Sequence, residues 1–74
     1  MEIVIDARGY LCPVPTLKLR RALEAALAGA HLRLLADDPM ARIDVPHFAS
    51  EAGVEVLEAV TDGAGLSFLV RKSP

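Results

Sequence analysis

The sequence predicts an α/β two-layer sandwich of order β-α-β-α-β-β, in which two helices cover one face of a four-stranded mixed sheet. Four short segments alternate apolar and polar residues or are rich in β-branched residues, which is typical of strands. Two longer runs place apolar residues at helical spacing. Two helices suffice to cover only one face of such a sheet, and this favours two layers over three.

Length and composition support one compact domain spanning 1–74. The chain has 74 residues, of which 53% are hydrophobic, and its net charge is −2. A composition this apolar argues against disorder, and the net charge argues against bulk attraction to nucleic acid. We expect no membrane segment, because no apolar run approaches about 20 residues, and we find no signal peptide. A single cysteine cannot form an internal disulfide, so we expect a reducing, cytoplasmic location.

The first strand is predicted over 2–6 (EIVID), followed by a loop over 7–11 in which Gly9 can supply an unusual backbone angle. The first helix is predicted over 13–28, with Pro13 at its first position and Cys12 as its cap. Cys12 then lies just beyond the carboxyl end of a strand, where α/β folds usually place their chemistry. The apolar stripe of this helix consists of Leu19, Ala22, Leu23, Ala26 and Leu27.

The second strand is predicted over 31–36 and, after a helical crossover, should pair in parallel with the first. Asp37-Asp38-Pro39 breaks the chain, and either aspartate can cap the next helix. We prefer one helix over 39–52 kinked at Pro46; the alternative is a short turn and a new helix capped by Asp44. Strands over 54–61 and 66–72 are joined by a hairpin turn at 62–65. The uncovered sheet face is expected to be partly apolar, with Val4, Leu57 and Leu69.

Cys12 is the residue most suited to chemistry. The positive end of a helix stabilises a thiolate, so we expect the pKa of Cys12 to lie below that of a free thiol. The surroundings in sequence are also basic, because residues 7–23 contain no Asp or Glu. Gly9, Pro13 and Pro15 would hold the loop and the thiolate in place. The alternative is that Cys12 is a small buried apolar residue.

Other side chains near Cys12 in sequence suggest a docking surface for a partner protein. Val14 and Leu17 fall off the apolar stripe of the first helix, on its basic side. Exposed apolar residues beside a reactive group are often an interface. The predicted docking residues are Arg8, Val14, Leu17, Lys18 and Arg21.

Other catalytic arrangements are disfavoured. His31 begins the second strand, so a parallel crossover puts it at the edge opposite Cys12, and His47 shows no spacing that pairs it with the thiol. Asp37 and Asp38 are expected to cap or turn the chain rather than to bind metal. One cysteine and two scattered histidines form no zinc pattern, and no phosphate loop is present. We therefore expect neither a metal nor a cofactor.

The Cys-Pro-x-Pro motif at 12–15, preceded by Asp6, Gly9 and Leu11, resembles that of the TusA/SirA family of small sulfur-carrier proteins. Three further stretches are similar to family features: Ala-Gly-Ala at 28–30, the acidic turn at 36–41, and Asp-Val-Pro-His-Phe at 44–48. The resemblance spans about 3–72. It implies the same α/β sandwich, with Cys12 as the sulfur-bearing residue and Pro13 and Pro15 as part of the motif.

The resemblance implies a stoichiometric sulfur carrier rather than a self-sufficient catalyst. Cys12 would accept a sulfane sulfur as a persulfide from a cysteine desulfurase or a rhodanese-like donor. A downstream sulfur-relay protein would take it, feeding tRNA thiolation or another sulfur pathway. No direct contact with nucleic acid or membrane is expected. The uncharged Val14 in the motif leaves the choice of partner open.

Two other functions remain open. The α/β sandwich also resembles the C-terminal domain of a bacterial translation initiation factor, and Lys18, Arg20 and Arg21 could contact phosphate in a nucleic-acid-binding or ribosome-binding module. Binding that survives Cys12→Ser would favour that function. Cys12 could instead be a reversible redox sensor. A sulfenate formed with peroxide, without a persulfide formed from a sulfur donor, would favour redox sensing.

Overall fold

The computed structural model describes residues 2–63 and 65–73 and has the predicted order of elements. The strands and helices are β1 (Glu2–Asp6), α1 (Val14–Ala25), β2 (His31–Ala36), α2 (Ala41–Ala52), β3 (Glu55–Asp62) and β4 (Gly65–Arg71). Neither α1 nor α2, at 12 residues each, has the length and apolar character that a membrane-spanning helix needs.

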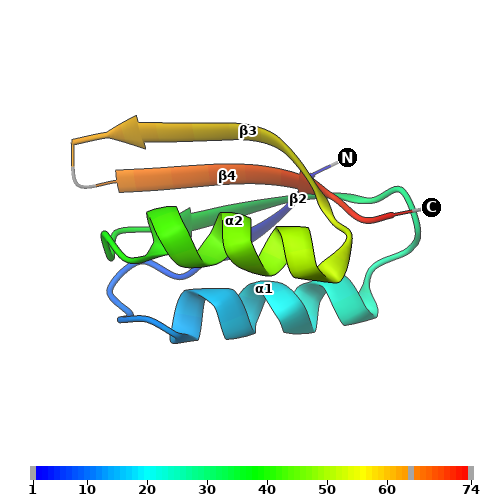
Figure 1. Ribbon diagram of the computed structural model, residues 1–74, viewed down its shortest axis with the longest axis horizontal. Coiled ribbons are helices and arrows are strands. Elements are labelled where there is room, and N and C mark those ends of the chain that lie inside the picture. The colour runs from blue at the N-terminus through cyan, green and yellow to red at the C-terminus, as the bar shows by residue number, and fades with distance from the viewer. Residues whose placement is uncertain (1, 64, 74) are drawn as a thin grey trace.

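The four strands form one mixed sheet in the order β1-β2-β4-β3. β1 and β2 are parallel, as predicted, while β4 is antiparallel to both β2 and β3. The two helices lie side by side on one face of this sheet (Figure 1). The predicted two-layer α/β sandwich is thereby confirmed.

The core lies between the sheet and the helices. The two central strands, β2 and β4, each turn alternate residues toward the helices, which explains their strictly alternating burial. From the helices, Leu19, Leu23 and Val45 meet them. The buried apolar residues of the strands are Leu32, Leu34, Ala36, Leu66, Phe68 and Val70. Because β2 is central and rigidly packed, the loop that follows its carboxyl end is firmly positioned.

Helix α1 ends three residues earlier than predicted, and Leu27 is 83% exposed rather than part of the apolar stripe. Ala26 is already extended, and the Lys72 ammonium donates a hydrogen bond to its carbonyl at 2.7 Å. Gly29, with φ +82°, turns the chain and donates its N–H to the Lys72 carbonyl at 3.0 Å. The contacts with Lys72 thus hold residues 26–29 outside the helix. This is a long-range effect that helical periodicity does not reveal.

Helix α2 continues through Pro46, as preferred over two separate helices, but it begins at Ala41 rather than at residue 39. Proline lacks an N–H, so the carbonyl four residues earlier, at Arg42, loses its helical partner. The chain tolerates this loss because Pro46 and Arg42 are both exposed, where water can solvate the free carbonyl. Gly53 ends the helix in the left-handed conformation, with φ +71°.

The uncovered face of the sheet is a mixture of apolar and charged side chains. Val4 and Leu57 are exposed and Leu69 is half-buried, in keeping with the expected apolar character. Arg33 adds a charged network, because it pairs with Glu2 and Glu58 at 3.1 Å each. β3 and β4 form the predicted hairpin; residue 64 of its turn at 62–65 lies outside the described residues.

Candidate functional site

Two loops meet at one edge of the sheet. Because β1 and β2 are parallel, their carboxyl ends share this edge, and both helices begin there (Figure 1). The first loop, between β1 and α1, carries Cys12. The second, between β2 and α2, carries Asp37 and Asp38. The topology therefore brings a thiol and two carboxylates together across a separation of about 26 residues.

The second loop anchors the first through hydrogen bonds to its backbone. Both carboxylate oxygens of Asp37 accept the N–H of Gly9 at 3.0 Å. Asp38, only 8% exposed, accepts the N–H of Cys12 at 2.5 Å and that of Met40 at 3.1 Å. Gly9 adopts φ +87°, a conformation that favours glycine. Both aspartates thus turn the chain, as expected, but neither caps α2, whose N-cap is Met40 without a side-chain cap hydrogen bond. Asp38 in addition fixes the main chain of Cys12.

The side chain of Cys12 is half-buried, and its Sγ–H donates a hydrogen bond to Asp44 Oδ2 in the first turn of α2. This bond, followed by desolvation and by the charges of Asp44 and Asp38, raises the pKa of Cys12 to about 11. The expected lowering of this pKa is therefore wrong. A carboxylate in direct contact outweighs the partial charge of a helix N-terminus, because it carries a full charge and accepts the proton of the thiol.

The prediction that Cys12 lies in basic surroundings is also wrong. Arg8 is engaged by Asp6 at 2.8 Å, which lowers the pKa of Asp6 to about 2. Lys18 lies over the ring of Tyr10, 4.7 Å from its centroid. The absence of acids over 7–23 holds in sequence, but the fold supplies carboxylates from the segment that begins α2. The sulfur is therefore in acidic surroundings.

Helix α1 begins one residue later than predicted, so the prolines of the motif lie one position earlier relative to it. Pro13, not Cys12, caps α1, because its carbonyl accepts the first helical hydrogen bond, from the N–H of Leu17 at 3.1 Å. The Cys12–Pro13 peptide bond is cis. Pro15 is buried in the first turn, where a missing N–H is not costly. Cys12 therefore precedes the helix, and its own N–H is satisfied by Asp38.

Four of the five predicted docking residues lie together. Val14, Leu17, Lys18 and Arg21 line one open hollow of about 470 Å³, whose other lining residues are Tyr10, Arg20 and Glu24. Leu17 is half exposed within it. Arg8 lies apart and lines a different hollow, beside β3 and β4. The structure therefore brings together the part of the predicted docking surface that belongs to α1.

Three further apolar side chains beside the site were not predicted. Leu11, next to Cys12, is 76% exposed, and Met40 and Ile43 are exposed at the start of α2. Ile43 falls off the apolar stripe of α2, a signal comparable to the one that identified Leu17. Asp44 was noted only as a possible helix cap, and its position in the Asp-Val-Pro-His-Phe stretch was the available signal.

The histidines lie where the topology puts them. His31 begins β2 and so lies at the edge opposite Cys12, as predicted. His47, one turn beyond Asp44, pairs with Glu51 at 2.9 Å and is largely exposed. Among residues 2–63 and 65–73, no group of three or more His, Cys, Asp or Glu side chains is placed to hold a metal ion.

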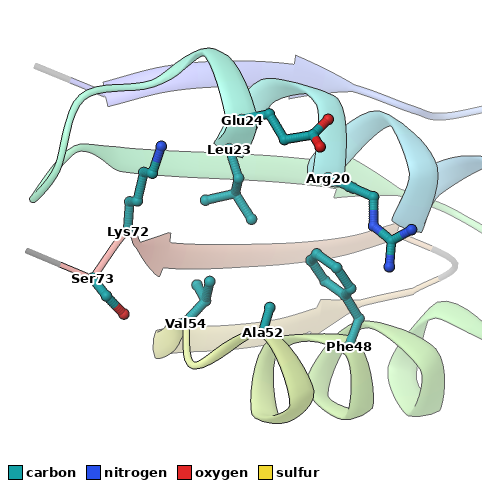
Figure 2. Close-up of a pocket in the computed structure, with 8 residues that line it drawn as sticks. All are labelled: Arg20, Leu23, Glu24, Phe48, Ala52, Val54, Lys72 and Ser73. Atoms are coloured by element: carbon teal, nitrogen blue, oxygen red, sulfur yellow. The ribbon is translucent and has the colours of Figure 1, made fainter.

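A separate hollow of about 350 Å³ lies between α1 and α2 (Figure 2). Leu23 and Phe48 face each other across it, and the guanidinium of Arg20 lies 5.5 Å from the centroid of the Phe48 ring. Lys72 and Ser73, which follow β4, close its other end. The residues that line it do not include Cys12, so the two sites are distinct.

Comparisons with known proteins show to which family the chain belongs. Residues 3–72 match the family described as Sulfurtransferase TusA. The chain is 36% identical to the sulfur carrier protein TusA of Allochromatium vinosum, over 93% of this chain and 91% of that protein. It is 34% identical to TusA of Pseudomonas putida, over 96% and 89%.

A solved structure shares the fold over the whole chain. The SirA-like protein from Desulfitobacterium hafniense is 26% identical and has a TM-score of 0.82, covering 100% of both chains. The family match and both TusA relatives extend over nearly the whole length, so the resemblance is not confined to the Cys-Pro-x-Pro motif. The chain belongs to the TusA family of sulfur-carrier proteins.

Proposed function

We propose that this protein carries sulfane sulfur as a persulfide on Cys12. A cysteine desulfurase or a rhodanese-like protein would supply the sulfur, and a downstream relay protein would remove it for tRNA thiolation or another sulfur pathway. The observation that supports this most directly is the placement of the one cysteine of the chain. It lies half-exposed at the edge where both helices begin, in a chain that matches a sulfur-carrier family over 3–72.

Sulfur uptake is an exchange at one S–S bond. The thiolate of Cys12 attacks the outer sulfur of the donor persulfide, and a new S–S bond forms at Cys12 Sγ. The S–S bond of the donor breaks, and its electron pair stays on the inner sulfur, which takes up a proton. The sulfane sulfur changes carrier, with no net oxidation, so the reaction needs no cofactor. Delivery repeats the same exchange with the acceptor thiol as nucleophile.

A carrier of this kind works through contact with its partners. The hollow lined by Val14, Leu17, Lys18 and Arg21 lies on the first turns of α1, the helix that follows Cys12. Leu11, next to Cys12, and Met40 and Ile43, at the start of α2, are further exposed apolar side chains. We propose that these apolar side chains and the cationic side chains of α1 dock both donor and acceptor, with 1–74 acting as one carrier domain. The reduced thiol required for uptake is consistent with a cytoplasmic location.

The test is intact mass after incubation with a cysteine desulfurase and cysteine, before and after a reductant. Cys12→Ser is the matched control, because serine preserves the shape and a hydrogen-bond donor. A gain of one sulfur atom that is lost on reduction and absent in Cys12→Ser is the expected result. No gain with that donor, nor with thiosulfate and a rhodanese, while Cys12 is still alkylated, would reject the carrier function.

A further inference from the structure

Cys12 is attached to the start of α2 at two points. Its N–H donates to Asp38 and its Sγ–H donates to Asp44, so both its main chain and its side chain are held by residues 38–44. Together these bonds fix the direction of the sulfur, which points toward Asp44 in the first turn of α2. A nucleophile that attacks a partner's sulfur has to leave this position.

We propose that Asp44 is a positioning residue for sulfur transfer: it locks Cys12 as a protonated thiol in the free carrier, and a donor activates the sulfur by pairing a positive group with Asp44. The proposal rests on the proposed function of Cys12. It adds a role for a side chain that no part of the sulfur chemistry had required.

The location of Asp44 suits this role. The side chain belongs to the first turn of α2, where the helix dipole stabilises a negative charge. The N–H of Asp44 donates to the Met40 carbonyl at 2.9 Å, so the backbone beneath the carboxylate is fixed. The charged groups around Asp44 are Asp38, which is also acidic, and Arg20, His47 and Glu51, which line the adjoining hollow with it. Among the described residues no basic group forms an ion pair with Asp44: His47 pairs with Glu51, and Arg20 lies over the Phe48 ring.

The hydrogen bond to Asp44 determines when the Cys12 thiol loses its proton. It does not alter which S–S bonds form and break. When a cationic group of the donor pairs with Asp44, the carboxylate no longer holds the thiol, and the proton of Cys12 passes to water. The thiolate then attacks the outer sulfur of the donor persulfide, whose inner sulfur leaves with the electron pair and takes up a proton. One proton is released and one is bound, and no oxidant or reductant is consumed.

The size of the effect follows from the acidity of the thiol. If Asp44→Asn lowers the pKa of Cys12 from about 11 by one to two pH units, the thiolate fraction at pH 7 rises about 10- to 100-fold. The intrinsic nucleophilicity of a thiolate falls with its pKa, with a Brønsted slope of about 0.5. The net increase in the rate of alkylation at pH 7 is therefore about 3- to 10-fold.

The experiment is the pH profile of alkylation by iodoacetamide, followed by mass on the full chain. Glu51→Gln is the matched control, because it removes the same charge from the same helix. We expect a midpoint near 11 in the unsubstituted protein, a lower midpoint and faster alkylation at pH 7 in Asp44→Asn, and no change in Glu51→Gln. A midpoint at or below about 9 in the unsubstituted protein would overturn the lock without any variant.

Two other results would also overturn it. One is a folded Asp44→Asn with an unchanged midpoint. The other is an equal increase from Glu51→Gln, which would assign the effect to overall charge. If Asp44→Asn fails to fold, Asp44→Ser and the profile of the unsubstituted protein provide the test. Alkylation involves no sulfur donor, so it tests the role of Asp44 separately from the carrier function. If the alkylation profiles are as expected but Cys12 takes up no sulfur, the proposed function is rejected and the hydrogen bond from Cys12 to Asp44 still stands.

Discussion

The carboxylate of Asp38 accepts the N–H of Cys12 at 2.5 Å and, through its other oxygen, the N–H of Met40 at 3.1 Å. One nearly buried side chain therefore joins the loop that carries the cysteine to Met40, the N-cap residue of α2. Because Asp44 lies one turn further along α2, the same contact also sets the position of the group that holds the sulfur.

We predict that Asp38→Ala destabilises the protein by about 3–6 kcal/mol, because hydrogen bonds to a charged group contribute about 1.5–3 kcal/mol each and two are lost. Urea unfolding measures the change. Asp37→Ala is the matched control: it is exposed and serves only the loop at Gly9, so we expect a loss of about 1 kcal/mol or less. Equal losses in the two variants would contradict the assignment of Asp38 as the main link between the loops.

The fold could be predicted because its signals are local. Ile3 and Ile5 lie on one face of a β-branched run in β1, and Leu66, Phe68 and Val70 lie on one face of β4. In β4 the period of two specifies which face is buried. The short crossovers then require β1 and β2 to be parallel, and this correctly placed His31 at the far edge. The order of the strands in the sheet was not predicted, because nothing local to β4 shows that it pairs with β2.

The chemistry of the site could be predicted only in part, because its decisive contacts are between distant segments. Cys12 was identified from its own motif. Its acidity was predicted from neighbours in sequence, whereas Asp44, 32 residues away, determines it. The parallel topology could have indicated this contact, because two helices that follow parallel strands begin at the same edge of the sheet. An acidic residue in the first turn of the second helix then faces whatever begins the first.

We predict that reversing two charges on α1, in Lys18→Glu with Arg21→Glu, slows sulfur transfer from a docked cysteine desulfurase about tenfold or more. Complementary charges govern how fast partners associate. Alkylation of Cys12 by iodoacetamide should change less than about twofold, because Lys18 is turned toward Tyr10. Stopped-time mass measurements give both rates.

Arg71→Glu is the matched control for this variant, since it changes a charge near the end of β4 that pairs with Glu55. It should leave transfer unchanged. Equal slowing of transfer and of alkylation by the α1 variant would instead place Lys18 and Arg21 in tuning the thiol.

We predict that Pro46→Ala stabilises the protein by about 1–2 kcal/mol. The substitution restores an N–H that can bond to the Arg42 carbonyl and removes the clash of the proline ring, effects that together exceed the entropy lost by proline in the unfolded chain. Thermal and urea unfolding measure the change. Pro39→Ala, just before α2, is the control and should not stabilise. A destabilised Pro46→Ala would show that the ring itself packs usefully in α2.

The stability of the fold should fall as pH rises from about 9 to about 11, because of Cys12. The hydrogen bond to Asp44 raises the folded pKa of the thiol to about 11, from a value of about 9 in the unfolded chain. Between these values the folded protein keeps its proton while the unfolded chain has lost it. Unfolding then releases a proton, so a higher pH favours unfolding. Below about 9 both states hold the proton, and the contribution does not change with pH.

Cys12→Ser isolates this contribution, because serine can donate to Asp44 but does not titrate in this range. The urea midpoints of the two proteins, measured at pH 8 and at pH 10.5, should diverge, with the cysteine protein losing more. All other groups are common to the two proteins and cancel in the comparison. If the two midpoints fell in parallel, the unfolded and folded thiols would have the same pKa. The hydrogen bond to Asp44 would then not raise the pKa of the Cys12 thiol.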